Sequence, residues 1–380
     1  MDSAPENLKP LTALRFAAAM WVVGYHYWPA LTHAAAPQII AKGYLGVELF
    51  FVLSGFILSH VYLQSFGQGG FRFGSFLWAR LARIYPLHLL MIVVLTVLIG
   101  LATLAGVKTG DQVLIWSSLP AQLSLTQAWG LGQAGGWDHP SWSISAEWFA
   151  YLSFPAFAWA AWRLRERPGV AVAAALVLLV GIEAGFQLFA GFPLTKATIA
   201  WGALRIVPCF AYGCAIWLMW RAARIHSPSK AAALSAGVLM AIVLAAAAGA
   251  PDSVCIILFG ALIFALAQLS SSGSRLLSSG LGVYLGEVSF AVYMVCIPWS
   301  LVFTKVAQKL MHLGDGVLPW PLWALMLVGV VPAAMLAHHL VERPARSAMR
   351  AWQASGFRLG RETPLQARIR RVTEPKPAMG

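Results

Sequence analysis

Long apolar runs, separated by short polar segments, recur along the whole chain. Two clear examples are LLMIVVLTVLIGLATLAG (89–106) and GVAVAAALVLLVGIEAGF (169–186). Each approaches the roughly 20 residues that a helix needs to cross a bilayer. The pattern predicts an all-α, polytopic membrane protein with about ten transmembrane helices. Their expected ranges are 11–31, 44–64, 76–104, 141–162, 169–190, 199–220, 231–250, 253–270, 281–304 and 320–341.

The segment 113–138 is the ambiguous part of this pattern, because Pro120 and several glycines interrupt it. The distribution of basic residues decides how it is interpreted, since cytoplasmic loops of membrane proteins are enriched in Lys and Arg. With ten crossings and both termini in the cytoplasm, the outer segments hold only five lysines, and 20 basic residues lie on the inner side. An eleventh crossing would move Arg72, Arg80 and Arg83 to the outside. We therefore expect 113–138 to be an external loop, with a partly re-entrant loop as the alternative.

Composition agrees with a membrane protein and argues against a nucleic-acid partner. Hydrophobic residues make up 59% of the chain and charged residues only 11%, with a mean hydropathy of +0.71. The net charge of +13 gathers at helix ends and in the last 35 residues, which is typical of membrane topology signals. We expect a membrane domain over 1–345 and a basic, disordered cytoplasmic tail over 346–380. The four cysteines have no metal-ligand spacing, so no metal site is expected.

Two polar side chains on the first predicted helix suggest a buried channel. Arg15 and His26 are eleven residues apart, so they lie near one helical face and are separated by about 16 Å of rise. Each has an ordinary alternative: an interfacial anchor for Arg15, and a hydrogen-bonded core histidine for His26. Glu48, on the second predicted helix, falls at a depth like that of His26, where it could orient the imidazole or form an ion pair with another helix. Arg205 and Glu183 form a further possible buried pair.

The third and fourth predicted helices add candidate binding residues. Arg80 and Arg83 share a helix face at the expected cytoplasmic mouth, at a depth like that of Arg15. Three arginines at one depth suit phosphate groups, although anchoring to the membrane surface is the alternative. Glu147 follows Trp142 and Ser143 near the outer side, and this combination of acid, aromatic ring and hydroxyl resembles a sugar-binding wall.

Taken together, these segments resemble the acyltransferase 3 family of integral-membrane acyltransferases, which O-acylate bacterial surface glycans and related acceptors. The similarity covers about residues 10–345 and follows the order of the family's segments. One departure is the ninth predicted helix, where Cys296 or Ile297 stands in place of a histidine that many relatives have. The segments that carry the resemblance are the R-x10-H pair of Arg15 and His26, GYLGVELFFVLSGFIL, RLARIYPLH, HPSWSISAEW, LGEVSFAVYMVCIPW and the closing VERP.

The resemblance implies an enzyme of the bacterial inner (cytoplasmic) membrane. Acyl-CoA, with acetyl as the family default, is the implied donor from the cytoplasm, and a hydroxyl of a glycan or lipid-linked saccharide is the implied acceptor outside. The family's essential arginine and histidine fall on Arg15 and His26, its RxxR pair on Arg80 and Arg83, and its acid on Glu147. A rival class is a transporter or flippase for a glycolipid or polysaccharide precursor, which also needs polar groups in its helices. A third possibility is a protein that moves only the acyl group outward and hands it to a separate enzyme.

Overall fold

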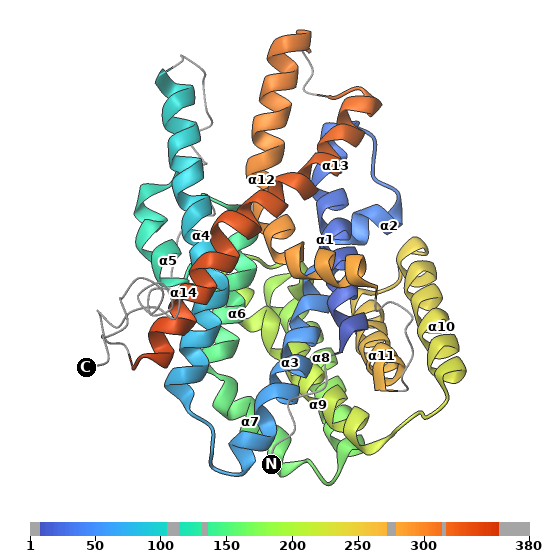
Figure 1. The fold of residues 1–380 in the computed structure, drawn as a ribbon. Helices are drawn as coiled ribbons and strands as arrows, with labels where there is room; N and C mark the ends of the chain where they lie inside the picture. The colour runs from blue at the N-terminus through green and yellow to red at the C-terminus, as the bar shows by residue number, and fades with distance from the viewer. Residues whose placement is uncertain (1–7, 105–113, 131–135, 272–278, 314–316, 357–380) are drawn as a thin grey trace, which may run out of the picture.

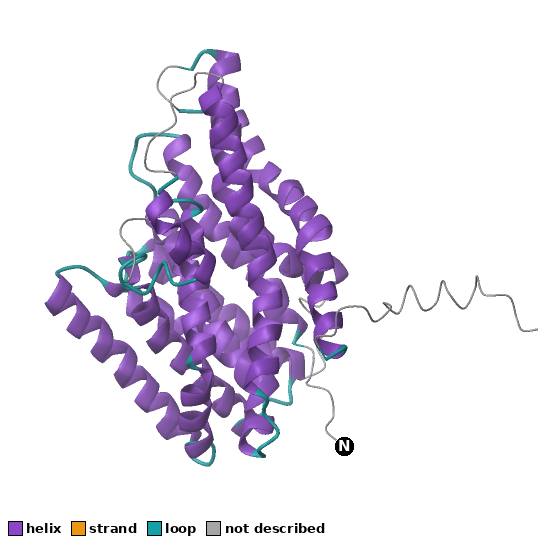
Figure 2. Ribbon diagram, turned by 90° about the vertical axis from the view of Figure 1, so that its left-hand side faces the viewer, coloured by secondary structure: helices purple, strands orange, loops and turns teal. Residues whose placement is uncertain are grey.

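The computed structural model describes residues 8–104, 114–130, 136–271, 279–313 and 317–356, and these residues form helices and loops without a strand (Figures 1 and 2). The α-helices in chain order are α1 (Lys9–Tyr27), α2 (Gln38–Ala41), α3 (Gly46–Gly67), α4 (Phe73–Leu104), α5 (Leu119–Ser124), α6 (Trp142–Leu152), α7 (Phe154–Arg163), α8 (Pro168–Ala190), α9 (Gly202–Ala222), α10 (Pro228–Ala247), α11 (Asp252–Ser271), α12 (Gly280–Met311), α13 (Trp320–Ala337) and α14 (Arg343–Ala354). The shorter elements are the 3-10 turns η1 (Trp28–Ala30), η2 (Lys42–Leu45), η3 (Trp116–Ser118), η4 (His139–Ser141) and η5 (Leu194–Lys196), and the π-helical turn η6 (His338–Glu342). The all-α expectation is therefore confirmed for the part of the chain that the structure describes.

Eight helical segments among the described residues are long and apolar enough to cross a membrane. They include α4, α8, α9, α10, α11 and α12, together with the continuous segments Gln38–Gly67 and Trp320–Ala354. The two other predicted crossings coincide with α1, which carries Arg15 and His26, and with the pair α6 and α7. That pair is interrupted at Ser153, just before Pro155, whose ring removes a backbone donor. Of the roughly ten predicted crossings, eight thus coincide with helices that have the required length and hydropathy.

The centre of the bundle is formed by helices that approach one another closely. Gly55 of α3 faces the carbonyl of Phe210 on α9, and Gly213 of α9 faces the carbonyl of Val52, so that a Cβ atom at either glycine would overlap a backbone oxygen. Small residues at such contacts allow helix backbones to pack tightly in a membrane. In α9, 72% of its most apolar stretch is buried, against 22% in α8 and α10. The outer helices therefore present apolar side chains such as Leu188 to their surroundings.

Basic residues gather at one end of the bundle. In Figure 1, α3, α7 and α9 all end toward the lower edge. Arg163 and Arg221 occupy the last turns of α7 and α9, and Arg72 follows α3 by a few residues. The opposite ends of α4 and α12 project beyond the other helices at the upper edge of Figure 1. This clustering is the pattern from which the positive-inside rule infers a cytoplasmic face.

The described part of the ambiguous segment 113–138 packs against the bundle and does not form a long helix. Its only α-helix is α5, of six residues. The backbone of Ala128 is hydrogen-bonded on both sides, with its N–H donating to Ser145 of α6 and its carbonyl accepting from Ala203 of α9. Gln122 accepts a bond from His88 of α4 through its backbone carbonyl, if the imidazole carries its proton on Nε2. This segment therefore supports the start of α6, on which several predicted site residues lie.

The helical structure also continues past the predicted end of the membrane domain at residue 345. Residues 346–354, which we assigned to a disordered tail, form most of α14. Figure 1 shows α14 lying across α4, and Trp78 of α4 donates a hydrogen bond from Nε1 to the carbonyl of Met349 at 2.8 Å. The amphipathic sequence of α14 explains why it packs on the bundle. Residues 357–380 lie outside the described residues.

Candidate active site

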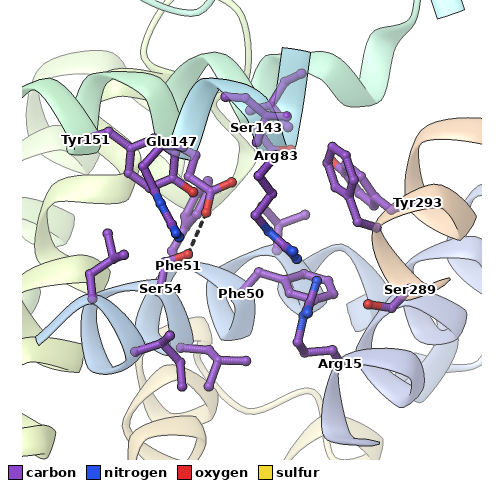
Figure 3. A pocket seen from close by; sticks show the side chains of 18 of the residues that line it. Arg15, Phe50, Phe51, Ser54, Arg83, Ser143, Glu147, Tyr151, Ser289 and Tyr293 are labelled. Carbon is purple, nitrogen blue, oxygen red and sulfur yellow. Dashed lines mark hydrogen bonds between the residues drawn. The ribbon is translucent and has the colours of Figure 1, made fainter. Parts of the chain in front are cut away.

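A cavity of about 250 Å³ lies between α1, α3, α4, α6, α12 and α14 (Figure 3). Phe50, Phe51 and Ile57 contribute an apolar wall from α3. The charged side chains that line it, among the described residues, are Arg15, Arg80, Arg83, Glu147 and Arg350. Four cations and one anion leave the lining with a formal charge of +3.

Arg15, Arg80 and Arg83, which we predicted to lie at one depth, line this cavity together. In Figure 3 the guanidinium groups of Arg15 and Arg83 point toward one another from opposite walls. Arg80 lies over the ring of Tyr62 and Arg83 over that of Phe290, at 5.8 and 5.9 Å from the centroids. Within the described residues, none of the three arginines has an ion-pair partner, and the buried Nε of Arg80 has no hydrogen-bond acceptor. Converging, unpaired guanidinium groups form a site for an anion, and phosphate fits their planar geometry.

Glu147 and Ser143, which we predicted to face an acceptor near the outer side, line the same cavity as the arginines. The hydroxyl of Ser54 donates to Glu147 Oε1 at 2.6 Å, and the hydroxyl of Ser143 donates to the carbonyl of Pro140 at 3.0 Å. The sequence could not show this, because it does not say which helices are neighbours, and in the fold the second turn of α6 brings Glu147 to Ser54 of α3. The placement puts Glu147 beside the cations and changes the side on which we expect it to act.

Glu48, which we predicted to support His26, instead forms a buried ion pair with another helix. Its Oε1 accepts a hydrogen bond from Arg205 Nε of α9 at 2.5 Å, and both side chains are almost fully buried. Arg205 therefore pairs with Glu48, and not with Glu183 as the sequence suggested. Trp142 is also buried, with its ring under the Arg205 guanidinium at 4.5 Å. Arg205 and the indole of Trp142 lie beside Glu48. Of the two roles considered for Glu48, the structure therefore shows the ion pair with another helix and not the support of His26.

His26 lies at the end of α1, outside the described lining of the cavity. Its ring makes edge contacts with Tyr25 and with His139 of η4, at centroid distances of 5.2 and 6.5 Å. The turn η4 also contacts the far end of the cavity, because Tyr293 of α12 donates its hydroxyl proton to the carbonyl of Pro140 at 3.0 Å. The segment from His139 to Ser143 therefore lies between the arginines and His26.

The sequence did not single out His139 or Asp138, although His139 opens the segment HPSWSISAEW and Asp138 directly precedes it. Both carboxyl oxygens of Asp138 are buried and have no hydrogen-bond partner among the residues that the structure describes. This burial raises the pKa of the Asp138 carboxyl well above its usual range, because the charged form loses its hydration. A buried, unpaired acid immediately before His139 is an expensive feature that ordinary packing does not explain.

Arg350 was also missed, because it lies in the segment that we assigned to a disordered tail. The signal that could have identified it was the amphipathic pattern of RPARSAMRAWQA, which predicts a helix at a membrane surface. Within the described residues, no group of three His, Cys, Asp or Glu side chains is gathered that could hold a metal ion. The four cysteines are free and buried.

Comparisons with known proteins show that the chain is similar to acyltransferases. Residues 9–339 match a family described as an acyltransferase domain. The chain is 29% identical to acyltransferase MdmB of Streptomyces mycarofaciens, over 89% of this chain and 91% of MdmB. It is 40% identical to protein 2 in the picA locus of Rhizobium radiobacter, over 23% of this chain and 44% of that protein. No solved structure matches the chain significantly.

Proposed function

The chain belongs to this acyltransferase domain family, and we propose that it is a membrane O-acyltransferase that takes its acyl group from cytoplasmic acyl-CoA. The observation that carries the choice of donor is the cavity that Arg15, Arg80 and Arg83 line together, without an ion-pair partner among the described residues. Coenzyme A carries a diphosphate joined to a long, thin pantetheine arm. Phosphate oxygens would supply the negative charge that these guanidinium groups lack.

The orientation of the donor follows from the basic end of the bundle. We take that end as the cytoplasmic face, in accordance with the positive-inside rule. Arg80 and Arg83 lie about two and three turns from the start of α4, which begins at that face. The pantetheine arm would then extend from the arginines past Ser143 and Tyr293 toward His26. Glu147 stands beside this path, where it would position the donor arm or the arginines and not the acceptor.

His26 is the proposed group for the chemical step. A neutral imidazole would take the proton of an acceptor hydroxyl while the hydroxyl oxygen attacks the thioester carbonyl. The carbon–sulfur bond then breaks, and the same proton passes to the coenzyme A thiolate, which leaves as the thiol. A transient acyl-imidazole on His26 is the second route to the same products. In either route His139, whose ring meets that of His26 edge to face, lies where it would contact the reacting groups.

The acceptor in this proposal is a hydroxyl of a glycan or lipid-linked saccharide at the outer face of the bacterial inner membrane, and the acyl group is acetyl. No observation favours a transporter, since the family and MdmB are both described as acyltransferases. Mass spectrometry of surface saccharides from a deletion strain tests the acceptor class. Loss of one acyl mass, restored by the wild-type chain and not by His26→Ala, is the expected result. Unchanged saccharide masses in the deletion strain would contradict the proposed acceptor.

A further inference from the structure

The cavity has a fourth arginine, Arg350, that comes from the helix α14. Of the four arginines in the lining, Arg15, Arg80 and Arg83 are half-buried, whereas Arg350 is exposed. The three half-buried arginines therefore form the inner part of the cavity, and Arg350 lies at its mouth. No hydrogen bond or ion pair engages Arg350 within the part of the chain that the structure describes.

α14 is held in this place by contacts with the start of α4. Trp78 Nε1 donates to the carbonyl of Met349, and the Trp78 and Trp352 rings meet edge to face at 5.2 Å. Gln353 Nε2 donates to the carbonyl of Ser75 at 3.2 Å. These contacts lie on both sides of Arg350 in the sequence, so its backbone position is fixed relative to Arg80 and Arg83 one to two turns further along α4.

The size of the cavity requires a large ligand to extend beyond it. Its volume of about 250 Å³ is smaller than the several hundred Å³ that pockets for whole drug-sized ligands have. A coenzyme A molecule that places its diphosphate at the inner arginines must therefore leave its adenosine part at the mouth. The ribose 3′-phosphate is the outermost charged group of the adenosine part. Arg350 is the lining cation that lies at the mouth of the cavity, where this phosphate would lie.

We propose that Arg350 of α14 binds the ribose 3′-phosphate of the acyl-CoA donor, so that α14 is a wall of the donor site and selects coenzyme A over its dephospho form. This inference rests on the proposed function. The three inner arginines would bind the diphosphate, which both forms of the coenzyme carry. Arg350 would contribute only when the 3′-phosphate is present.

The test is calorimetric titration of coenzyme A and dephospho-coenzyme A into the purified full-length chain, at one fixed salt concentration. We expect the wild type to bind coenzyme A more tightly than dephospho-coenzyme A. Arg350→Ala should weaken coenzyme A binding by about ten- to a hundredfold, the usual range for a charge-assisted contact, and leave dephospho-coenzyme A binding unchanged. Arg350→Lys should restore part of the loss, because it keeps the charge but not the planar fork.

Arg343→Ala is the matched control, since Arg343 is exposed on the same helix and does not line the cavity. It should leave both affinities unchanged. Equal affinity of the wild type for the two ligands would overturn the inference, as would an Arg350→Ala variant that loses both equally or neither. In these cases the wild type still binds the donor and the proposed function stands. A wild type that binds neither ligand would overturn the proposed function and this inference together.

Discussion

At the scale of single residues, the proposed mechanism divides the roles between His26, which takes part in the chemical step, and the arginines, which bind the donor. His26 lies beside His139 and away from the cavity, so its loss should affect the chemical step and not donor binding. We expect His26→Ala to lower acyl transfer at least a hundredfold, because a general base usually contributes about 10²- to 10⁴-fold. Transfer from radiolabelled acyl-CoA, measured in membranes with equal protein levels, checks this. Activity within a few-fold of wild type would remove His26 from the mechanism.

Asp138 gives a second prediction at this scale, which concerns stability and pH. Because burial raises the pKa of its carboxyl in the folded chain, the folded state keeps a proton that the unfolded state has already released. The contribution of Asp138 to stability therefore falls as the pH rises from the ordinary aspartate value, about 3.9, to the raised value in the fold.

Asp138→Asn should remove this loss, because the amide cannot ionise. We expect the detergent-solubilised Asn variant to have a higher Tm than the wild type at about pH 8, with the difference shrinking toward about pH 5. Thermal unfolding followed by tryptophan fluorescence at several pH values measures it. A wild type more stable than Asp138→Asn at alkaline pH would mean that the folded chain holds the carboxylate in its charged form.

Single residues also show what the sequence could predict about the site. Depth along a helix follows from position, so Arg15, Arg80 and Arg83 could be placed at one level, and the structure brings them into one cavity. The partner of Glu48 could not be predicted, because it depends on which helices are neighbours and how they are rotated. The pairing of α3 with α9 decides that Arg205, and not His26, reaches this carboxylate.

At the scale of elements, the close pairing of α3 with α9 holds the site together. α3 supplies the apolar wall of the cavity and Ser54, while α9 supplies the Arg205 partner of Glu48. Gly213→Ala should separate the two helices, because its Cβ atom would overlap the carbonyl of Val52. Overpacking of this kind costs about 1–3 kcal/mol, so a lower Tm and weakened donor binding are expected.

Gly181→Ala in α8 is the control for this variant, because a Cβ atom there meets nothing within 4 Å. It should leave the Tm and donor binding unchanged. A Gly213→Ala variant as stable as Gly181→Ala would show that α3 and α9 are less tightly packed than described.

The sequence predicts the helices well where apolar runs are long. It predicts them poorly where contacts with neighbouring helices determine which residues form a helix. The runs that became α4, α8, α10 and α11 carry their own signal of length and hydropathy. The interruption between α6 and α7 has a local cause in Pro155, and the local signal for α14 is its amphipathic sequence. α14 is polar on average, so a search for apolar runs does not find it, and two hydrogen bonds and a ring contact join it to Trp78 and Ser75 of α4.

At the scale of the whole molecule, the proposed topology places the donor mouth in the cytoplasm. Cysteine labelling tests it, because the four native cysteines are buried and give little background. Ala35→Cys, in the exposed loop after η1, should react with a membrane-impermeant maleimide in cells with a permeable outer membrane. Gln68→Cys, in the exposed loop after α3, should react only after the inner membrane is opened. The reverse pattern would invert the topology and put the arginine cavity on the outer side.

The most direct test of the central claim, that the arginine cavity binds the phosphates of a coenzyme A donor, is calorimetric titration of coenzyme A into purified wild type, Arg80→Ala and Arg83→Ala. Arg72→Ala is the matched control, since Arg72 is an exposed basic residue just before the same helix and does not line the cavity. We expect each cavity variant to express normally and to lose about ten- to a hundredfold in affinity, which corresponds to ~1.5–3 kcal/mol per charge-assisted contact. Arg72→Ala should bind coenzyme A as the wild type does. Unchanged affinity in both cavity variants, with reduced membrane insertion, would identify Arg80 and Arg83 as interfacial anchors and contradict the donor site.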